Sequence, residues 1–240
     1  MSGAVLDHRG ETMPAAPTKR PGEGRRIRLT DVVKEFHTQF GIKRVIDGIS
    51  FDIEYGEKIA VLGRNGAGKS TLVKLIGGVE PPTSGTIDIG LNMSWPVAFG
   101  GGFDVSMSGY DNIRFIARLY GKQITDMVDF VDDFAELGKN LRLPVRTYSS
   151  GMRARLMFAL TLAIEFECIL IDELIAVGDQ RFHRRCHDEL FVKRKDCAMI
   201  LISHDVLTIR EYCQKALVLK AGRGRVFEDL DFAISIYSSL

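Results

Sequence analysis

The sequence predicts an α/β protein with a mostly parallel sheet at its core and a helical lobe inserted into it. Three observations predict this fold. Short apolar runs alternate with helical patterns, first from residue 58 and again from residue 168, as in proteins built around a parallel sheet. Between these regions, from about 109 to 165, the pattern is helical throughout. Hydrophobic residues make up 45% of the 240 residues, which is enough for a buried core.

The first part of the domain is expected to be rich in strands. The segment 44–53 alternates apolar and polar residues, as a half-buried strand does, whereas 58–63 is continuously apolar, which is typical of a buried parallel strand. A helix is expected from Lys69. In all, strands are predicted at 27–33, 44–53, 58–63, 85–90 and 93–99. Residues 1–26 contain three prolines and little apolar surface, so we expect a flexible tail ahead of one folded domain at 27–240.

The helical lobe is expected at about 105–165. One helix should end at Gly121, since glycine is common just beyond helix C-termini. The next helix, at 125–137, has one apolar face, formed by Met127, Phe130, Val131 and Phe134. A further apolar run at 156–164 is typical of a buried helix. After the lobe, we expect a strand at 168–173, a helix at 178–195, a strand at 198–204, a hairpin at 215–229 and a short final helix.

Composition excludes some functions. The net charge is +1, from 32 basic and 31 acidic residues, so no overall positive field is present to hold nucleic acid, and we expect none as a partner. None of the four cysteines has C-x-x-C spacing, which favours free thiols over a metal site. The sequence has no apolar run of about 20 residues, the length that a membrane-spanning helix needs. Any membrane span should therefore belong to a partner.

The segment GRNGAGKST at 63–71 fits the phosphate-binding pattern G-x-x-x-x-G-K-[ST]. It follows a predicted strand and opens a predicted helix, and this context argues against the alternative of a glycine-rich turn with a chance lysine. Backbone N–H groups would close around the β-phosphate, Lys69 would reach the β- and γ-phosphates, and Ser70 would offer a hydroxyl to Mg²⁺. The residues predicted to contact nucleotide are Gly63, Arg64, Asn65, Gly66, Ala67, Gly68, Lys69, Ser70 and Thr71.

Two later strands are also predicted to end in functional side chains. Asp172 and Glu173 follow the apolar run at 168–171, and the carboxyl edge of a parallel sheet is where α/β folds bind ligands. Asp172 would hold Mg²⁺ directly or through water, and Glu173 would be the general base for the attacking water. His204 ends the next strand and would contact the γ-phosphate. Solvated acids at a strand end and a structural histidine are the alternatives.

With these parts in this order, the chain resembles the ATP-binding-cassette (ABC) ATPases over about 27–240. YSSGM at 148–152 is similar to the family signature L-S-G-G-Q, with Ser150 and Gly151 on the key positions, and AVGD at 176–179 is similar to its D-loop, which ends here in Asp179. Phe36 matches the aromatic that stacks on adenine, although a buried strand-end aromatic would look the same. The resemblance implies ATP and Mg²⁺ as cofactors, hydrolysis of ATP, an N-terminal antiparallel β subdomain and the helical lobe.

The resemblance also implies a homodimer of two subunits that face each other head to tail. Ser150 and Gly151 would contact the γ-phosphate that the partner's Lys69 loop binds. The signature then needs no lysine of its own. A serine that merely caps a helix is the alternative, and both roles are compatible with the same atoms.

A narrower resemblance is to the ATPase subunits of bacterial polysaccharide exporters, and the stretch MSWPVAFGGGF at 93–103 is most similar to their capsular branch. It implies a peripheral subunit at the cytoplasmic face of the inner membrane. A separate membrane permease would dock near 99–120. Teichoic acid, O-antigen or another cargo is an alternative. Less favoured alternatives are a non-transport ABC ATPase of DNA repair or translation and a P-loop kinase. One departure from the family is that 93–112 holds no glutamine, where the family uses one near Mg²⁺, and Asp104 is the nearest polar residue.

Overall fold

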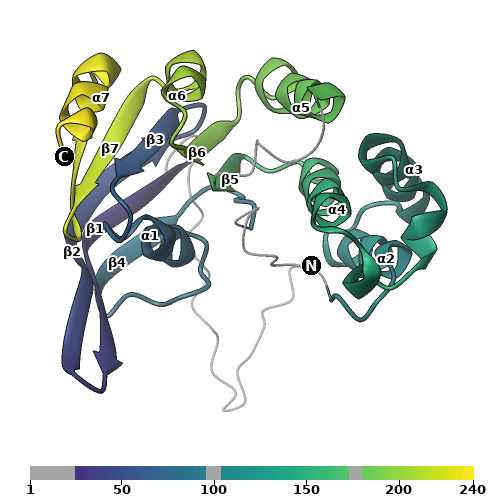
Figure 1. Cartoon of the computed structure of the whole chain (residues 1–240), viewed down its shortest axis with the longest axis horizontal. Coiled ribbons are helices and arrows are strands. Elements are labelled where there is room, and N and C mark those ends of the chain that lie inside the picture. Colours follow the sequence, from purple (N-terminus) through teal and green to yellow (C-terminus); the bar gives the residue numbers. More distant parts are fainter. Residues whose placement is uncertain (1–24, 96–103, 173–179) are drawn as a thin grey trace, which may run out of the picture.

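The computed structural model describes residues 25–95, 104–172 and 180–240. Its first layer is a three-stranded antiparallel sheet in the order β2-β1-β4 (Figure 1). The strands are β1 (Arg26–Thr38), β2 (Gly41–Glu54) and β4 (Ser84–Ile89). β1 and β2 form a long hairpin, because the register runs from Arg26 opposite Glu54 to Thr38 opposite Gly41. Antiparallel pairing in this layer agrees with the expected N-terminal β subdomain.

The second layer is a five-stranded sheet in the order β5-β6-β3-β7-β8. Its strands are β3 (Lys58–Gly63), β5 (Cys168–Asp172), β6 (Ala198–Ile202), β7 (Lys215–Lys220) and β8 (Arg223–Phe227). The first four strands in this order are parallel, and β8 pairs antiparallel with β7 as the second strand of a hairpin. The carboxyl ends of β5, β6 and β3 therefore meet at one edge. The predicted mostly parallel sheet is confirmed.

Helices lie on both sides of this sheet. Two groups of buried side chains form the core: one joins helix α1 to both sheets, and the other joins the opposite side of the large sheet to the remaining helices. The helices of the sheet region are α1 (Lys69–Ile76), α5 (Gln180–His187), α6 (Val206–Tyr212) and α7 (Leu230–Ser238), with a π-helical turn, η5 (Asp188–Lys193), after α5. The expected single helix at 178–195 is thus α5 followed by η5 within the described residues.

The helical lobe stands apart from the sheets in Figure 1. It consists of α2 (Gly109–Leu119), α3 (Ile124–Ala135), α4 (Ser150–Leu162) and two 3-10 turns, η2 (Gly138–Arg142) and η3 (Val145–Thr147). The predicted face of α3 points inward: Met127, Val131 and Phe134 are buried, and the ring of Phe130 stacks on that of Phe134 at 5.8 Å. Gly121 follows the C-terminal end of α2 with φ +62°, which glycine adopts without strain.

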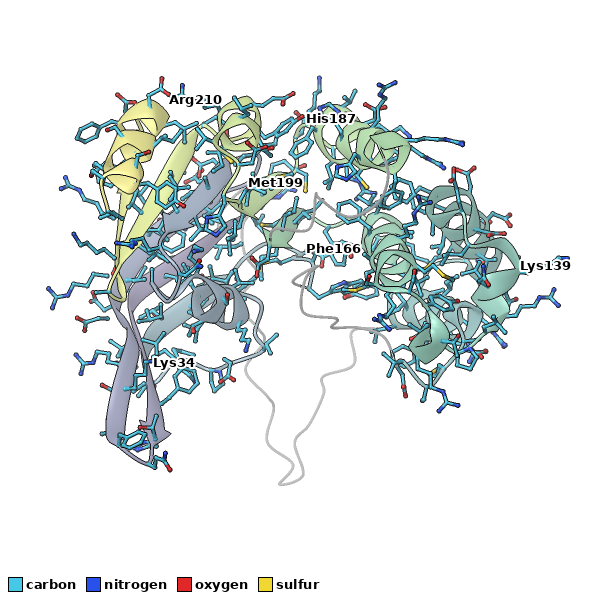
Figure 2. The ribbon with its side chains drawn as sticks, viewed as in Figure 1. Lys34, Lys139, Phe166, His187, Met199 and Arg210 are labelled. Atoms are coloured by element: carbon cyan, nitrogen blue, oxygen red, sulfur yellow. The ribbon has the colours of Figure 1, made fainter. Side chains whose placement is uncertain are left out.

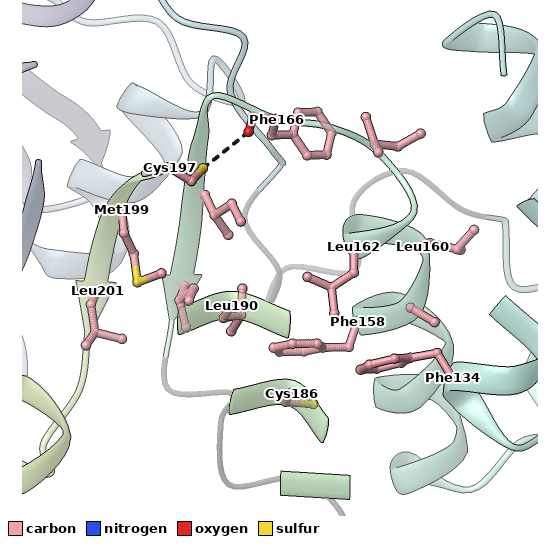
Figure 3. Close-up of a cluster of buried hydrophobic side chains, with 14 of the residues drawn as sticks. Phe134, Phe158, Leu160, Leu162, Phe166, Cys186, Leu190, Cys197, Met199 and Leu201 are labelled. Atoms are coloured by element: carbon pink, nitrogen blue, oxygen red, sulfur yellow. Dashed lines mark hydrogen bonds between the residues drawn. The ribbon is translucent and has the colours of Figure 1, made fainter. Parts of the chain in front are cut away.

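The lobe and the sheet share part of their core. Figure 3 shows side chains of α3, α4 and α5 packed with those of β6, and the Cys197 thiol donates to the Phe166 carbonyl at 3.2 Å. Phe166 itself lies between the lobe and the sheet (Figure 2). All four cysteines are buried and free, as expected. Burial raises the pKa of the Cys197 thiol to about 11 and that of Cys186 to about 12, so both are protonated at neutral pH.

The strand predicted at 93–99 is wrong in its described part, residues 93–95. Only Met93 pairs there, through an isolated parallel bridge to Cys168. The next residue, Ser94, donates its N–H to the Cys168 carbonyl at 2.9 Å, but its hydroxyl accepts the N–H of Leu170 at 3.0 Å. The Ser94 hydroxyl accepts the Leu170 N–H that a carbonyl of a neighbouring strand would otherwise accept. The ladder of backbone hydrogen bonds therefore ends here. Residues 96–99 lie outside the described residues.

No helix in the described ranges is both long and apolar enough to cross a bilayer.

Candidate functional site

A cavity of about 1080 Å³ opens at the carboxyl end of β3, between the two sheets and the N-terminus of α1. Four separate regions of the chain line it: the β1–β2 hairpin, the glycine-rich loop, the end of β5 and the β7–β8 turn. The lining residues are Phe36, Lys43, Arg44, Val45, Asn65, Gly66, Gly68, Lys69, Ser70, Thr71, Asp172, Ala221 and Gly222. Eight of the residues predicted from sequence therefore meet in one cavity.

The glycine-rich loop is held in a shape that exposes backbone amides. Gly66 and Gly68 have φ values of +82° and +112°, where a side chain is strained. At Gly68 a Cβ would also lie 2.9 Å from Cδ1 of Ile46 and 3.0 Å from the Val45 carbonyl oxygen. The loop then runs directly into α1, whose first turn contains no acidic residue. Free N–H groups and the helix dipole make this end of α1 attractive to phosphate.

Lys69 lies against the loop. Its Nζ donates to the Gly63 carbonyl at 2.6 Å and to the Arg64 carbonyl at 3.3 Å. The ammonium group is thus held at the mouth of the loop. A phosphate oxygen is a charged acceptor and makes a stronger hydrogen bond with Lys69 than a carbonyl does.

Ser70 and Asp172 line the same cavity and supply one hydroxyl and one carboxylate. Oxygen ligands of this kind suit Mg²⁺, which keeps several waters and binds through one or two carboxylates plus phosphate oxygens. The described residues hold no group of three or more His, Cys, Asp or Glu side chains that could form a metal site alone. The Ser70 hydroxyl and the Asp172 carboxylate therefore fit Mg²⁺ that phosphate oxygens also bind.

Phe36 is half-buried near the end of β1 and lines the cavity. The Lys34 ammonium lies 5.0 Å from the ring centroid, a cation–π distance. Phe36 is thus not fully buried, and its contact with a base stays a prediction.

Five lining residues were not predicted from the sequence: Lys43, Arg44, Val45, Ala221 and Gly222. The hairpin register places Lys43 opposite Phe36 and Arg44 opposite Glu35, which nothing local in the sequence specifies. Arg44 donates to Glu35 at 2.8 Å and to Asp47 at 2.9 Å. Hydrogen bonds from Arg223, and next from Arg44, hold the pKa of Asp47 below its usual value.

The remaining loop residues lie just outside this cavity. Arg64 and Ala67 line a neighbouring cavity of about 240 Å³, and Gly63 contributes its carbonyl to Lys69. His204 follows β6, is exposed and does not line the main cavity; its Nδ1 lies 3.0 Å from the Tyr237 hydroxyl. Glu173 and Asp179 lie outside the described residues.

Ser150 and Gly151 form the first turn of α4, on the lobe side of the molecule (Figure 1). The N-cap is Ser149, whose hydroxyl accepts the N–H of Met152 at 3.2 Å. Ser150 is exposed. Neither Ser150 nor Gly151 lines the cavity at the carboxyl end of β3 in its own chain. A capping role therefore belongs to Ser149, and Ser150 keeps its hydroxyl available at a helix N-terminus.

A second feature is a groove of about 780 Å³ at the junction of lobe and sheet. It is lined by Trp95, Asp104, Val105, Met107, Asn112, Phe115, Ile116, Leu119 and Tyr120. Phe115 and Leu119 are 54% and 64% exposed, which is unusual for large apolar side chains on neighbouring turns of a helix. Asp104 accepts both the hydroxyl and the N–H of Ser106, which lowers the pKa of its carboxyl group.

Comparison with known proteins places these features in context. Residues 46–176 match the ABC transporter family. The chain is 53% identical over 212 residues to the ATP-binding protein BexA of Haemophilus influenzae, covering 88% of this chain and 98% of that protein. It is also 53% identical to the capsule polysaccharide export ATP-binding protein CtrD of Neisseria meningitidis serogroup B, covering 89% and 99%.

Among solved structures, the fold is similar to the dimeric post-hydrolysis state of the ATP-binding cassette MJ0796 bound to ADP and phosphate. The TM-score is 0.69 at 18% identity, with 84% of this chain and 97% of that chain covered. At this identity, the likeness concerns the fold.

Proposed function

The chain belongs to the ABC transporter family, and we propose that it is the ATP-hydrolysing subunit of a transporter that exports capsular or related cell-surface polysaccharide. The observation that carries the proposal is the single cavity in which Lys69, Ser70 and Asp172 meet an aromatic ring from another sheet. The 53% identity to CtrD, a capsule polysaccharide export ATP-binding protein that the match covers almost completely, supports the export role.

The residues predicted from the sequence have separate roles in this proposal. The ring of Phe36 stacks on adenine, the loop amides and Lys69 hold the phosphates, and Ser70 and Asp172 hold Mg²⁺. A metal held there would supply positive charge to offset that of the phosphates. Glu173 accepts the proton of the attacking water, and His204 donates to the γ-phosphate. Positioning and charge stabilisation are the main contributions, since phosphoryl transfer needs little covalent chemistry from the protein.

The complete site is proposed to form only in a homodimer. Ser150 and the N–H groups at the start of α4 would contact the γ-phosphate held by the partner's Lys69 loop, and Asp179 would lie near the same interface. The exposure of Ser150 and its absence from the cavity of its own chain support this arrangement. The dimeric state of the MJ0796 cassette is consistent with it.

The apolar groove at the lobe junction is the proposed docking surface for a separate membrane permease. At the base of the groove, the rings of Trp95, Tyr120 and Phe166 form a packed cluster with centroid distances of 5.4 to 6.0 Å. Phe115 and Leu119 are exposed on its rim. Docking there would hold the subunit at the cytoplasmic face of the inner membrane, where closure on ATP moves the permease. Asp104, next to the groove, has no assigned part in hydrolysis.

The cargo is proposed to be a capsular-type polysaccharide. Teichoic acid or O-antigen remains the alternative, because the hydrolytic residues would be the same and only the permease would differ. A DNA-repair role fits less well, since the balanced charge of the chain gives it no general attraction to nucleic acid.

Export can be tested with Lys69→Ala introduced into the chromosomal copy of the gene. Loss of the phosphate-binding ammonium group should lower ATPase activity of the purified chain about 10²-fold or more. Polysaccharide should then accumulate inside the cells, and surface polysaccharide should fall. Lys139→Ala, on the exposed outer end of the lobe (Figure 2), is the matched control and should behave as wild type. If Lys69→Ala abolishes hydrolysis while surface polysaccharide is unchanged, the ATPase assignment stands and the cargo assignment fails.

The adenine contact can be tested with Phe36→Ala. Base–aromatic stacking is worth about 1–3 kcal/mol, so KM for ATP should rise about tenfold or more while kcat stays within about twofold. Phe36→Tyr keeps the ring and should retain the KM of the wild type. Steady-state kinetics measure both parameters. An unchanged KM in Phe36→Ala would mean that the base binds elsewhere.

A further inference from the structure

Helix α7 is held in place beside His204 by several contacts. Asp229 caps its N-terminus by accepting the N–H of Phe232 at 2.9 Å, and Ala233 and Ile234 are buried against the sheet. Arg210 of α6, whose side chain lies beside α7 in Figure 2, pairs with Asp231 at 2.5 Å. Because α6 begins two residues after His204, these contacts fix α7 relative to the segment that carries the histidine.

The far end of α7 contacts two residues of the predicted catalytic machinery. The Tyr237 hydroxyl lies 3.0 Å from Nδ1 of His204, and the ring of Tyr237 packs against the main core. Three residues on, the Leu240 carbonyl accepts a hydrogen bond from Nη1 of Arg64, in the phosphate-binding loop, at 3.0 Å. The end of α7 is therefore joined both to the loop after β3 and to the histidine after β6, two strands that are neighbours in the sheet.

The contact between Tyr237 and His204 affects which nitrogen of a neutral imidazole carries the proton. One ring nitrogen carries a proton and donates, and the other accepts, so a hydrogen bond at one nitrogen decides what the other can do. Phosphate oxygens accept hydrogen bonds only. A histidine that contacts the γ-phosphate through Nε2 must therefore carry its proton there, and a partner that donates to Nδ1 enforces this tautomer.

We propose that Tyr237 is a positioning residue for His204: its hydroxyl donates to Nδ1, fixes the ring orientation and keeps the proton on Nε2 for the terminal phosphate of the nucleotide. The proposal rests on the proposed ATPase function. It gives α7 a role in hydrolysis. This role lies outside the phosphate-binding loop, the signature and the strand end that carries Asp172 and Glu173.

The kinetic test is Tyr237→Phe, which removes the hydroxyl and keeps the ring that packs in the core. Loss of one positioning hydrogen bond should lower kcat about threefold to tenfold, with KM for ATP within about twofold and an unchanged melting temperature. The matched control is Tyr55→Phe, an exposed tyrosine just after β2 that has no part in the proposed site, which should have wild-type kinetics. A kcat of Tyr237→Phe equal to or above that of the wild type would overturn the proposal.

A double-mutant cycle separates positioning from a general effect on the fold. His204→Ala should lower kcat more strongly than Tyr237→Phe, and adding Tyr237→Phe to it should have no further effect, because the hydroxyl then has no ring to orient. Additive losses would show that Tyr237 acts independently of His204 and would refute the proposal. An inactive wild-type chain would instead refute the ATPase function itself.

Nitrogen NMR of the imidazole side chains gives a readout that does not depend on turnover. The chain has five histidines, and the signal that His204→Ala removes identifies the one of interest. At about pH 8, where an ordinary histidine is neutral, the chemical shifts should show the Nε2–H tautomer in the wild type and a mixture in Tyr237→Phe. A predominant Nδ1–H tautomer in the wild type would contradict the assigned direction of the hydrogen bond.

Discussion

Replacing Glu173 with glutamine is expected to slow ATP hydrolysis about 10²- to 10⁴-fold, the usual contribution of a general base, while ATP still binds. The amide cannot accept the proton of the attacking water, but it has nearly the same size and leaves the loop, Lys69 and Asp172 intact. In the proposed cycle hydrolysis reopens the dimer, so ATP-bound dimers of this variant should accumulate. Turnover assays measure the first effect, and gel filtration with ATP and Mg²⁺ measures the second.

The matched control for this variant is Glu165→Gln. Glu165 lies just before β5, at the opposite end of that strand from Asp172, and its side chain is 86% exposed and paired with Lys122. An exposed ion pair contributes little, so hydrolysis and the oligomeric state should be unchanged. Turnover close to wild type in Glu173→Gln would assign the base to another residue.

Mixing two inactive variants is expected to restore about a quarter of wild-type activity. Lys69→Ala removes phosphate binding and leaves the start of α4 intact, whereas Ser150→Arg blocks α4 and leaves the loop intact. In a two-fold dimer, each site combines the loop of one subunit with α4 of the other, so a mixed dimer has one intact site and one site with both defects. Equal mixing makes half of the dimers mixed, each with one good site of two, which gives about a quarter if the sites act independently.

Two controls make this result interpretable. Cross-linking must show that mixed dimers form, and the double variant with both substitutions must restore nothing when mixed with Lys69→Ala. Ser150 is exposed in the single chain, so Ser150→Arg should fold normally, as melting curves can verify. Mixed dimers that bind ATP but hydrolyse no more than either parent would mean either that the start of α4 serves its own chain or that the two sites work only together. Single-turnover assays with ATP prebound at the intact site distinguish these cases.

The sequence alone determined the parts of the protein in which neighbouring residues act together. The predicted phosphate-binding loop is contiguous, from Gly63 to Thr71, since a loop of this kind uses neighbouring backbone amides, and its flanking strand and helix have strong local patterns. Asp172 was predictable for a related reason: the carboxyl ends of parallel strands meet at one edge, whatever their order. The buried face of α3 followed from helical periodicity in the same way.

Tertiary structure decided the rest, because it depends on contacts between residues far apart in the chain. Lys43 and Val45 enter the cavity through the register of the β1–β2 hairpin. Next to β5, the Ser94 hydroxyl ends the strand that the apolar pattern at 93–99 predicted, by accepting a backbone N–H that lies 76 residues away. Tyr237 meets His204 only because α7 packs back against β7 and α6, which brings together residues 33 positions apart in the chain. Periodicity reports which face of an element is buried, but not which element covers it, so contacts of this kind are fixed by packing alone.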